Sequence, residues 1–133
     1  MAADIPIAIA SDKDVVEARQ RGRALALDLG FSVGETVLIA TAISELARNV
    51  VSYAGHGMVM LRQGNSAGRV SLTIIATDHG PGIADVALAL RDGYSSSGGL
   101  GLGLPGVRRL MDEFEIVSEP GRGTTVTVRK WRL

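Results

Sequence analysis

Glycine is concentrated in one part of this chain, which limits how that part can fold. The chain has 17 glycines, and they gather between His79 and Gly123 rather than spreading evenly. Glycine is favoured where a backbone turns sharply or approaches a ligand closely. We therefore expect the functional site to include the loops of this segment.

Length and composition exclude several classes of protein. A chain of 133 residues has the size of one domain, so we expect residues 1–133 to form a single domain. Lys plus Arg and Asp plus Glu are both 14, so no net charge attracts nucleic acid or anionic lipid. There is no cysteine, and no apolar run approaches the ~20 residues that span a bilayer. The first residues lack a basic segment and include Asp4, so we expect no secretory signal and a cytoplasmic protein.

The pattern of residues predicts one strand and two helices before residue 55. Apolar and small residues alternate over residues 5–9, as in a short strand. Helices are predicted to run to about Leu29, ended by Gly30, and to about Ala54, ended by Gly55. Their capping-box signals are Ser11 with Asp14 and Ser32 with Glu35.

Two hairpins and two short helices are predicted in the remainder. The predicted strands are 58–62, 69–78, 114–118 and 124–132, the helices 84–90 and 104–113, and the longer loops 63–68 and 92–103. The order is βααββααββ. Helices segregated from hairpins imply the α+β class, as a two-layer sandwich with helices on one face of a mixed sheet.

The second helix carries a polar stripe that is a candidate binding surface. Glu45 and Asn49 are four residues apart, so their side chains lie one turn apart and can converge on one ion or phosphate. Arg48, beside Asn49, is a candidate for neutralising phosphates. The solvated face of an ordinary amphipathic helix would carry the same pair.

An acidic residue stands where a predicted strand leaves the sheet. Asp78 is followed by a loop with Gly80 and Gly82. A carboxylate there can accept a hydrogen bond from an exocyclic amine, and the glycines would leave space for a flat base. A turn begun by Asp and continued by Pro and Gly is the alternative.

A glycine-rich loop leads directly into a helix. Its residues are Gly98, Gly99, Leu100, Gly101, Leu102 and Gly103. Free N–H groups at a helix start favour phosphate, whereas a flexible surface loop is the competing interpretation. It is no Walker A loop, because no Gly-Lys-Ser/Thr follows, and no strand immediately precedes it as in a Rossmann fingerprint.

Further on, Thr124 begins the last predicted strand and would place a hydroxyl beside a base, although threonine is also an ordinary strand residue.

These four segments, in this order, resemble the boxes of the GHKL ATPase superfamily. The blocks over residues 42–49, 92–95 and 106–114 are further similar to the RsbT-like serine/threonine kinases of the stressosome, which are related to anti-sigma factor kinases. The likeness covers most of residues 39–128 and less of the first forty.

The resemblance implies a Bergerat-type ATP fold that uses ATP and Mg²⁺. It assigns Glu45 as general base, Asn49 as the Mg²⁺ ligand, Asp78 as the reader of the adenine amine and Thr124 as its support. The backbone of the glycine loop would cover the phosphates.

The same resemblance implies a kinase that phosphorylates a serine or threonine of a STAS-domain protein and then engages a second regulator, such as a phosphatase. Two alternatives remain: an ATP-responsive binding module that needs no catalysis, and an anti-sigma factor kinase that binds a sigma factor directly. Both histidines, His56 and His79, fall in predicted loops, so histidine autophosphorylation is not expected.

Overall fold

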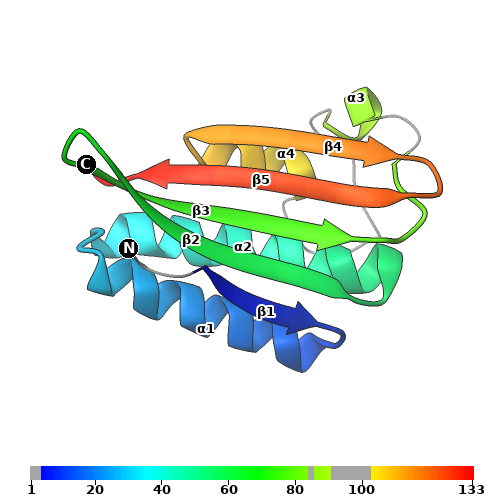
Figure 1. The fold of residues 1–133 in the computed structure, drawn as a ribbon, viewed down its shortest axis with the longest axis horizontal. Coiled ribbons are helices and arrows are strands. Elements are labelled where there is room, and N and C mark those ends of the chain that lie inside the picture. The colour runs from blue at the N-terminus through cyan, green and yellow to red at the C-terminus, as the bar shows by residue number, and fades with distance from the viewer. Residues whose placement is uncertain (1–3, 84–85, 91–102) are drawn as a thin grey trace.

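The structure, a computed structural model, describes residues 4–83, 86–90 and 103–133. Its elements in chain order are β1 (Ile5–Ile9), α1 (Asp12–Asp28), α2 (Val33–Ala54), β2 (Gly57–Ser66), β3 (Arg69–Asp78), α3 (Val86–Ala89), α4 (Gly103–Leu110), β4 (Glu113–Glu119) and β5 (Gly123–Trp131). The strands form one sheet in the order β1-β2-β3-β5-β4, and α1, α2 and α4 lie behind it (Figure 1). The predicted α+β class and the order of elements are confirmed.

The sheet is antiparallel at every pairing, where the sequence predicted a mixed sheet. β3 and β4 are connected through helices, which is the connection that parallel neighbours require. However, β5 lies between them and pairs antiparallel with each. The crossover therefore passes over one strand and forms no parallel ladder.

The hairpin between β2 and β3 is tighter than the loop predicted over residues 63–68. Pairing continues to Ser66 opposite Arg69, so that only Ala67 and Gly68 form the turn. Both have positive φ, 54° and 83°, as in the two-residue turns that join antiparallel strands. Residues 64–66 are exposed, so their polar composition belongs to a solvent-facing strand rather than to a loop.

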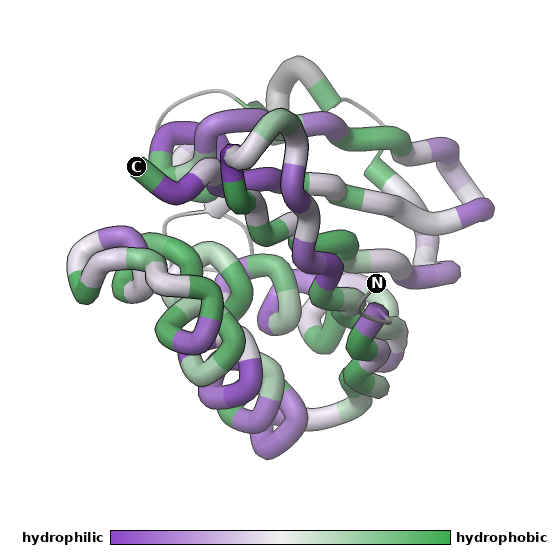
Figure 2. Tube along the Cα trace, turned by 60° about the vertical axis from the view of Figure 1, so that its left-hand side comes forward, coloured by the Kyte–Doolittle hydropathy of each residue, from purple (hydrophilic) through white to green (hydrophobic). Residues whose placement is uncertain are grey.

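α2 is the central helix of the core. One stripe of it is buried against the sheet and α1, and includes Ile39, Ile43, Leu46 and Val50. Every second residue of the facing strands completes the core: Ile7, Ile9, Val59, Leu61, Leu72, Ile74, Val126 and Val128. Figure 2 shows the resulting alternation of hydrophobic and hydrophilic stretches along helices and strands. None of the described helices is long and apolar enough to cross a membrane.

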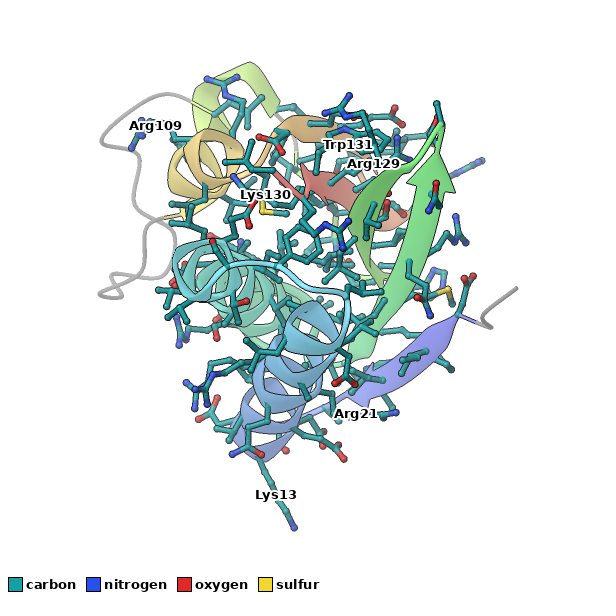
Figure 3. All side chains as sticks on the ribbon, turned by 90° about the vertical axis from the view of Figure 1, so that its left-hand side faces the viewer. Lys13, Arg21, Arg109, Arg129, Lys130 and Trp131 are labelled. Atoms are coloured by element: carbon teal, nitrogen blue, oxygen red, sulfur yellow. The ribbon has the colours of Figure 1, made fainter. Side chains whose placement is uncertain are left out.

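β5 fixes the position at which α4 ends. Lys130 Nζ donates to the carbonyl oxygen of Leu110 at 3.1 Å and lies 3.6 Å from Asp112. A cation at a helix C-terminus is favourable because the last carbonyl groups have no partners within the helix. Figure 3 shows Lys130 directed toward α4, whereas Arg129 and Trp131 lie together on the opposite side of β5.

The Glu35 carboxylate joins the start of α2 to the last residue of the chain. Ser32 and Glu35 form both bonds of a capping box, with Ser32 N–H donating to Glu35 Oε1 at 2.8 Å. Glu35 Oε2 accepts from the N–H of Leu133 at 3.0 Å. Burial alone raises the pKa of Glu35, but the N–H groups of Ser32 and Leu133, the Ser32 hydroxyl and the charge of Lys130 outweigh it. The pKa therefore lies below its usual value of 4.5.

We predict that Glu35→Gln lowers the free energy of unfolding by about 1–2 kcal/mol at neutral pH, because a carboxamide offers one acceptor oxygen to two N–H donors. The depressed pKa of Glu35 means that its stabilisation is present above pH 4.5 and is lost as the pH falls through the folded-state pKa. Urea titrations over this range should show the variant and the wild type converging in acid. Glu17→Gln, at an exposed position of α1, is the control. A difference that is constant with pH would contradict the role of the carboxylate.

Candidate functional site

A cleft opens between α2 and the ends of β3 and β5. It contains about 840 Å³ of empty space, counted out to its open mouth. We call it the central cleft. It is lined by Leu46, Asn49, Val50, Tyr53, Ala76, Asp78, Gly82, Ile83, Ala89, Gly103, Leu104, Thr124 and Val126. Its walls are thus mostly apolar, with a few polar groups from separate elements.

Asp78 and Thr124 provide the polar groups at the sheet side of the central cleft. They lie opposite each other where β3 pairs with β5. Asp78 Oδ1 accepts from the N–H of Gly80 at 2.9 Å, which is the Asp-initiated turn that was the alternative interpretation. An ionised carboxylate has about four acceptor positions, so this bond leaves capacity for a ligand. The turn and the binding role are therefore compatible.

Asn49 provides the polar group on the helix side. It lies one turn before Tyr53 on α2, and both line the central cleft. The described residues include no group of three or more His, Cys, Asp or Glu that would hold a metal ion by themselves. A cation at Asn49 would thus need oxygens from a ligand and from water, which suits Mg²⁺ bound to phosphates.

Glu45 lies one turn before Asn49 on α2 and is paired with Arg48, and neither Glu45 nor Arg48 lines the central cleft. Glu45 is only 7% exposed. Its Oε1 accepts from Arg48 Nη1 at 2.8 Å, and its Oε2 from the N–H of Gly103 at a long 3.4 Å. The carboxylate is therefore directed at the first residue of α4. Arg48 is paired with this carboxylate rather than pointing to the cleft.

The glycines after β3 are required by close backbone contacts. A Cβ on Gly82 would lie 2.2 Å from the carbonyl oxygen of Glu119, and one on Gly123 would lie 2.1 Å from that of Asp78. The N–H of Gly121 also donates to the carbonyl oxygen of Pro81 at 2.7 Å. Gly80 packs against α2 and does not line the cleft, whereas Gly82 does. We conclude that Gly82, Gly121 and Gly123 join the loop to the β4–β5 turn, and that Gly82 is the one among these three that lines the cleft.

The structure therefore brings together Asn49, Asp78, Gly82, Gly103 and Thr124, with Glu45 and Arg48 adjacent through α4. Gly98, Gly99, Leu100, Gly101 and Leu102 lie outside the described residues.

Sequence reasoning missed the apolar walls and one serine. Tyr53 was detectable, because it is four residues beyond Asn49 on the same stripe. Ser118 also carried a signal: the alternation of β4 assigns it to the inner face with Phe114 and Ile116, where a polar residue needs a partner. No sequence signal pointed to Ile83, because it lies in an irregular loop.

Comparison with known proteins defines the class. Residues 34–133 match the family of histidine kinase-, DNA gyrase B- and HSP90-like ATPases. The chain belongs to this family, which confirms the GHKL assignment.

A narrower family follows from individual relatives. Serine/threonine-protein kinase RsbT of Bacillus subtilis (strain 168) is 50% identical over 125 residues, covering 94% of each chain. The chain therefore belongs with the RsbT-type serine/threonine-protein kinases, as predicted. The anti-sigma F factor of Halalkalibacterium halodurans is 35% identical over 106 residues, covering 74% of this chain and 71% of that protein.

Solved structures support the fold alone. The crystal structure of the RsbU and RsbW domains of Rv1364c from Mycobacterium tuberculosis superposes with a TM-score of 0.65 at 20% identity. The match covers 99% of this chain and 34% of that one, so our chain spans about a third of its length. The mycobacterial sensor histidine kinase MprB gives a TM-score of 0.56 at 21% identity, with 98% of each chain covered.

We predict that Gly82→Ala destabilises the protein by about 1–3 kcal/mol, because the residue has a φ of 77° and its new methyl group would collide with backbone. Gly34→Ala is the matched control. It lies in the first turn of α2, with no atom nearer than 4.0 Å to the added Cβ, and should be neutral or slightly stabilising. Equal denaturation midpoints for the two variants would refute the close-contact argument.

Proposed function

We propose that the protein binds Mg-ATP in the central cleft and transfers the γ-phosphoryl group to a serine or threonine of a STAS-domain protein. The observation that carries this proposal is the meeting of Asp78, Thr124 and Asn49 in one apolar cleft. Apolar walls suit a flat base, Asp78 suits an exocyclic amine, and Asn49 lies where phosphates and their cation would be held. Membership of an ATPase family supports the same ligand.

Glu45 is the residue proposed for the chemical step. In the transfer, a bond forms between the acceptor hydroxyl oxygen and the γ-phosphorus, and the bond from that phosphorus to the β–γ bridging oxygen breaks. The proton of the hydroxyl passes to the Glu45 carboxylate. Phosphoryl transfer depends mainly on positioning and charge neutralisation, so a single oriented carboxylate is a sufficient base.

The other residues bind and orient. Asn49 would hold Mg²⁺, which neutralises charge on the phosphate oxygens when bound. The glycine loop, of which the structure describes only Gly103, is proposed to cover the phosphates with backbone N–H groups. Arg48 is paired with Glu45, so any contribution of Arg48 to phosphate binding would require that pair to separate.

The similarity to known proteins supports two further functions. The likeness to anti-sigma F factors supports direct binding of a sigma factor, which a pull-down against sigma factors would test. RsbT-type membership supports release from the phosphorylated partner and engagement of a second regulator, such as a phosphatase, in the cytoplasm. If a variant that has lost phosphotransfer, such as Glu45→Gln, still binds that regulator, binding of the regulator does not require catalysis.

We predict that Asp78→Asn weakens ATP binding by about 5- to 100-fold. The amide oxygen can still accept from Gly80, so the turn is kept, but an amide N–H₂ would then oppose the adenine amine. The preference for ATP over GTP should fall as well, because guanine has a carbonyl oxygen at that position. Calorimetry with both nucleotides measures this, with the exposed Asp28→Asn as control. Unchanged ATP affinity would remove Asp78 from base recognition.

We predict that Glu45→Gln reduces phosphotransfer to a STAS-domain partner by about 100- to 10,000-fold while ATP binding stays within about threefold. Labelled ATP measures transfer and calorimetry measures binding. Glu45→Ala should behave in the same way, and Glu17→Gln should leave both unchanged. Transfer at the wild-type rate by the Gln variant would exclude Glu45 as the base.

A further inference from the structure

Ser118 connects the three segments that surround the base end of the central cleft. Its Oγ accepts from the N–H of Ile83 at 2.7 Å, in the loop after β3. The same oxygen lies 2.7 Å from Oγ1 of Thr124 and 3.2 Å from the carbonyl oxygen of Gly123, both on β5. Ile83 and Thr124 line the central cleft, but Ser118 does not. Any effect of Ser118 on a ligand must therefore pass through its neighbours.

The direction of the Ser118–Thr124 hydrogen bond decides what Thr124 can offer a ligand. Each hydroxyl has one proton. If Ser118 donates to Thr124, the proton of Thr124 is free to donate into the cleft. If Ser118 donates to Gly123, Thr124 donates to Ser118 and presents only an acceptor to the cleft.

Adenine bound against Asp78 requires the arrangement in which Ser118 donates to Thr124 and Thr124 donates into the cleft. An ionised carboxylate only accepts, so Asp78 reads a donor such as the adenine amine. The neighbouring ring nitrogen of adenine, N1, is an acceptor and requires a donor beside Asp78. Thr124 lies directly opposite Asp78 across the β3–β5 pair. Guanine has the reverse pattern, with a carbonyl oxygen and an N–H.

A ligand acceptor beside Thr124 selects donation from Ser118 to Thr124. The Ile83 N–H occupies one lone pair of Ser118 at a short distance, which fixes the orientation of the oxygen. The 2.7 Å bond between Ser118 and Thr124 is made in either direction, so its length does not decide which hydroxyl donates. When the proton of Thr124 is given to an acceptor in the cleft, the proton of Ser118 turns to the Thr124 oxygen, which is nearer than the Gly123 carbonyl oxygen at 3.2 Å.

We propose that Ser118 is a positioning residue that sets nucleotide specificity, by holding the Thr124 hydroxyl as a donor toward N1 of adenine. This inference rests on the proposed function, because it requires the base of ATP to lie against Asp78. It also links recognition to the loop containing Ile83, since the same Ser118 oxygen accepts from that loop.

The test compares ATP with 1-deaza-ATP, in which a C–H group replaces N1. Ser118→Ala should weaken ATP binding by about three- to tenfold, the worth of one neutral hydrogen bond, and change 1-deaza-ATP binding by less than about twofold. Ser118→Thr keeps the hydroxyl and should restore the preference for ATP. Ser71→Ala removes another buried strand serine, at the far end of β3, and should alter neither affinity.

The outcomes separate the two proposals. If wild-type protein binds no ATP, the proposed function fails and the role of Ser118 fails with it. If the wild type binds ATP but Ser118→Ala weakens both nucleotides equally, Ser118 only supports the loop and the positioning role is overturned. Unchanged binding of ATP by Ser118→Ala overturns it as well. Thermal unfolding of each variant, recorded beside the titrations, reports any loss of folded protein, and the ratio of the two affinities is independent of that loss.

Discussion

The central cleft depends on a close backbone contact between the loop that follows β3 and the turn between β4 and β5. Gly82 lies against the carbonyl oxygen of Glu119, and Gly123 against that of Asp78, at separations that leave no space for a Cβ. This contact brings the loop after β3 onto the β4–β5 turn. Asp78 is the last residue of β3 and Thr124 the second residue of β5, so the distance between their side chains is set by this contact rather than by the ligand. Polar groups positioned in advance lose little entropy on binding.

α2 gives the cleft its second wall and connects it to the core. The stripe with Ile39, Ile43 and Leu46 is buried, while Asn49 and Tyr53 continue along the cleft. A helix rotates 100° per residue, so the packing of the core stripe also fixes the direction of Asn49. The capping box at Ser32 and Glu35 fixes where that register begins. The helix side of the site therefore depends on core packing.

Most elements were predictable because their signals are local, whereas the arrangement of strands was not. The start of α2 follows from Ser32 and Glu35, and β3 from its apolar run. The antiparallel sheet could not be read from the sequence, since the insertion of β5 beside β3 depends on pairing between distant segments. For the same reason the sequence predicted that Asp78 and Asn49 belong to one site but not that Ser118 connects β4, β5 and the loop. The turn at Ala67 was missed because exposed strands and loops share a polar composition.

In the proposed mechanism, the residue for the chemical step, Glu45, is positioned by other contacts than the residues that bind the base. Asp78 and Thr124 are fixed by the sheet, but the Glu45 carboxylate also contacts the first residue of α4. α4 is in turn held at its other end by Lys130 of β5. The Glu45 carboxylate is thus fixed in position from two sides, by Arg48 on its own helix and by the start of α4. Changes that move α4 should therefore affect phosphotransfer before they affect recognition of the base.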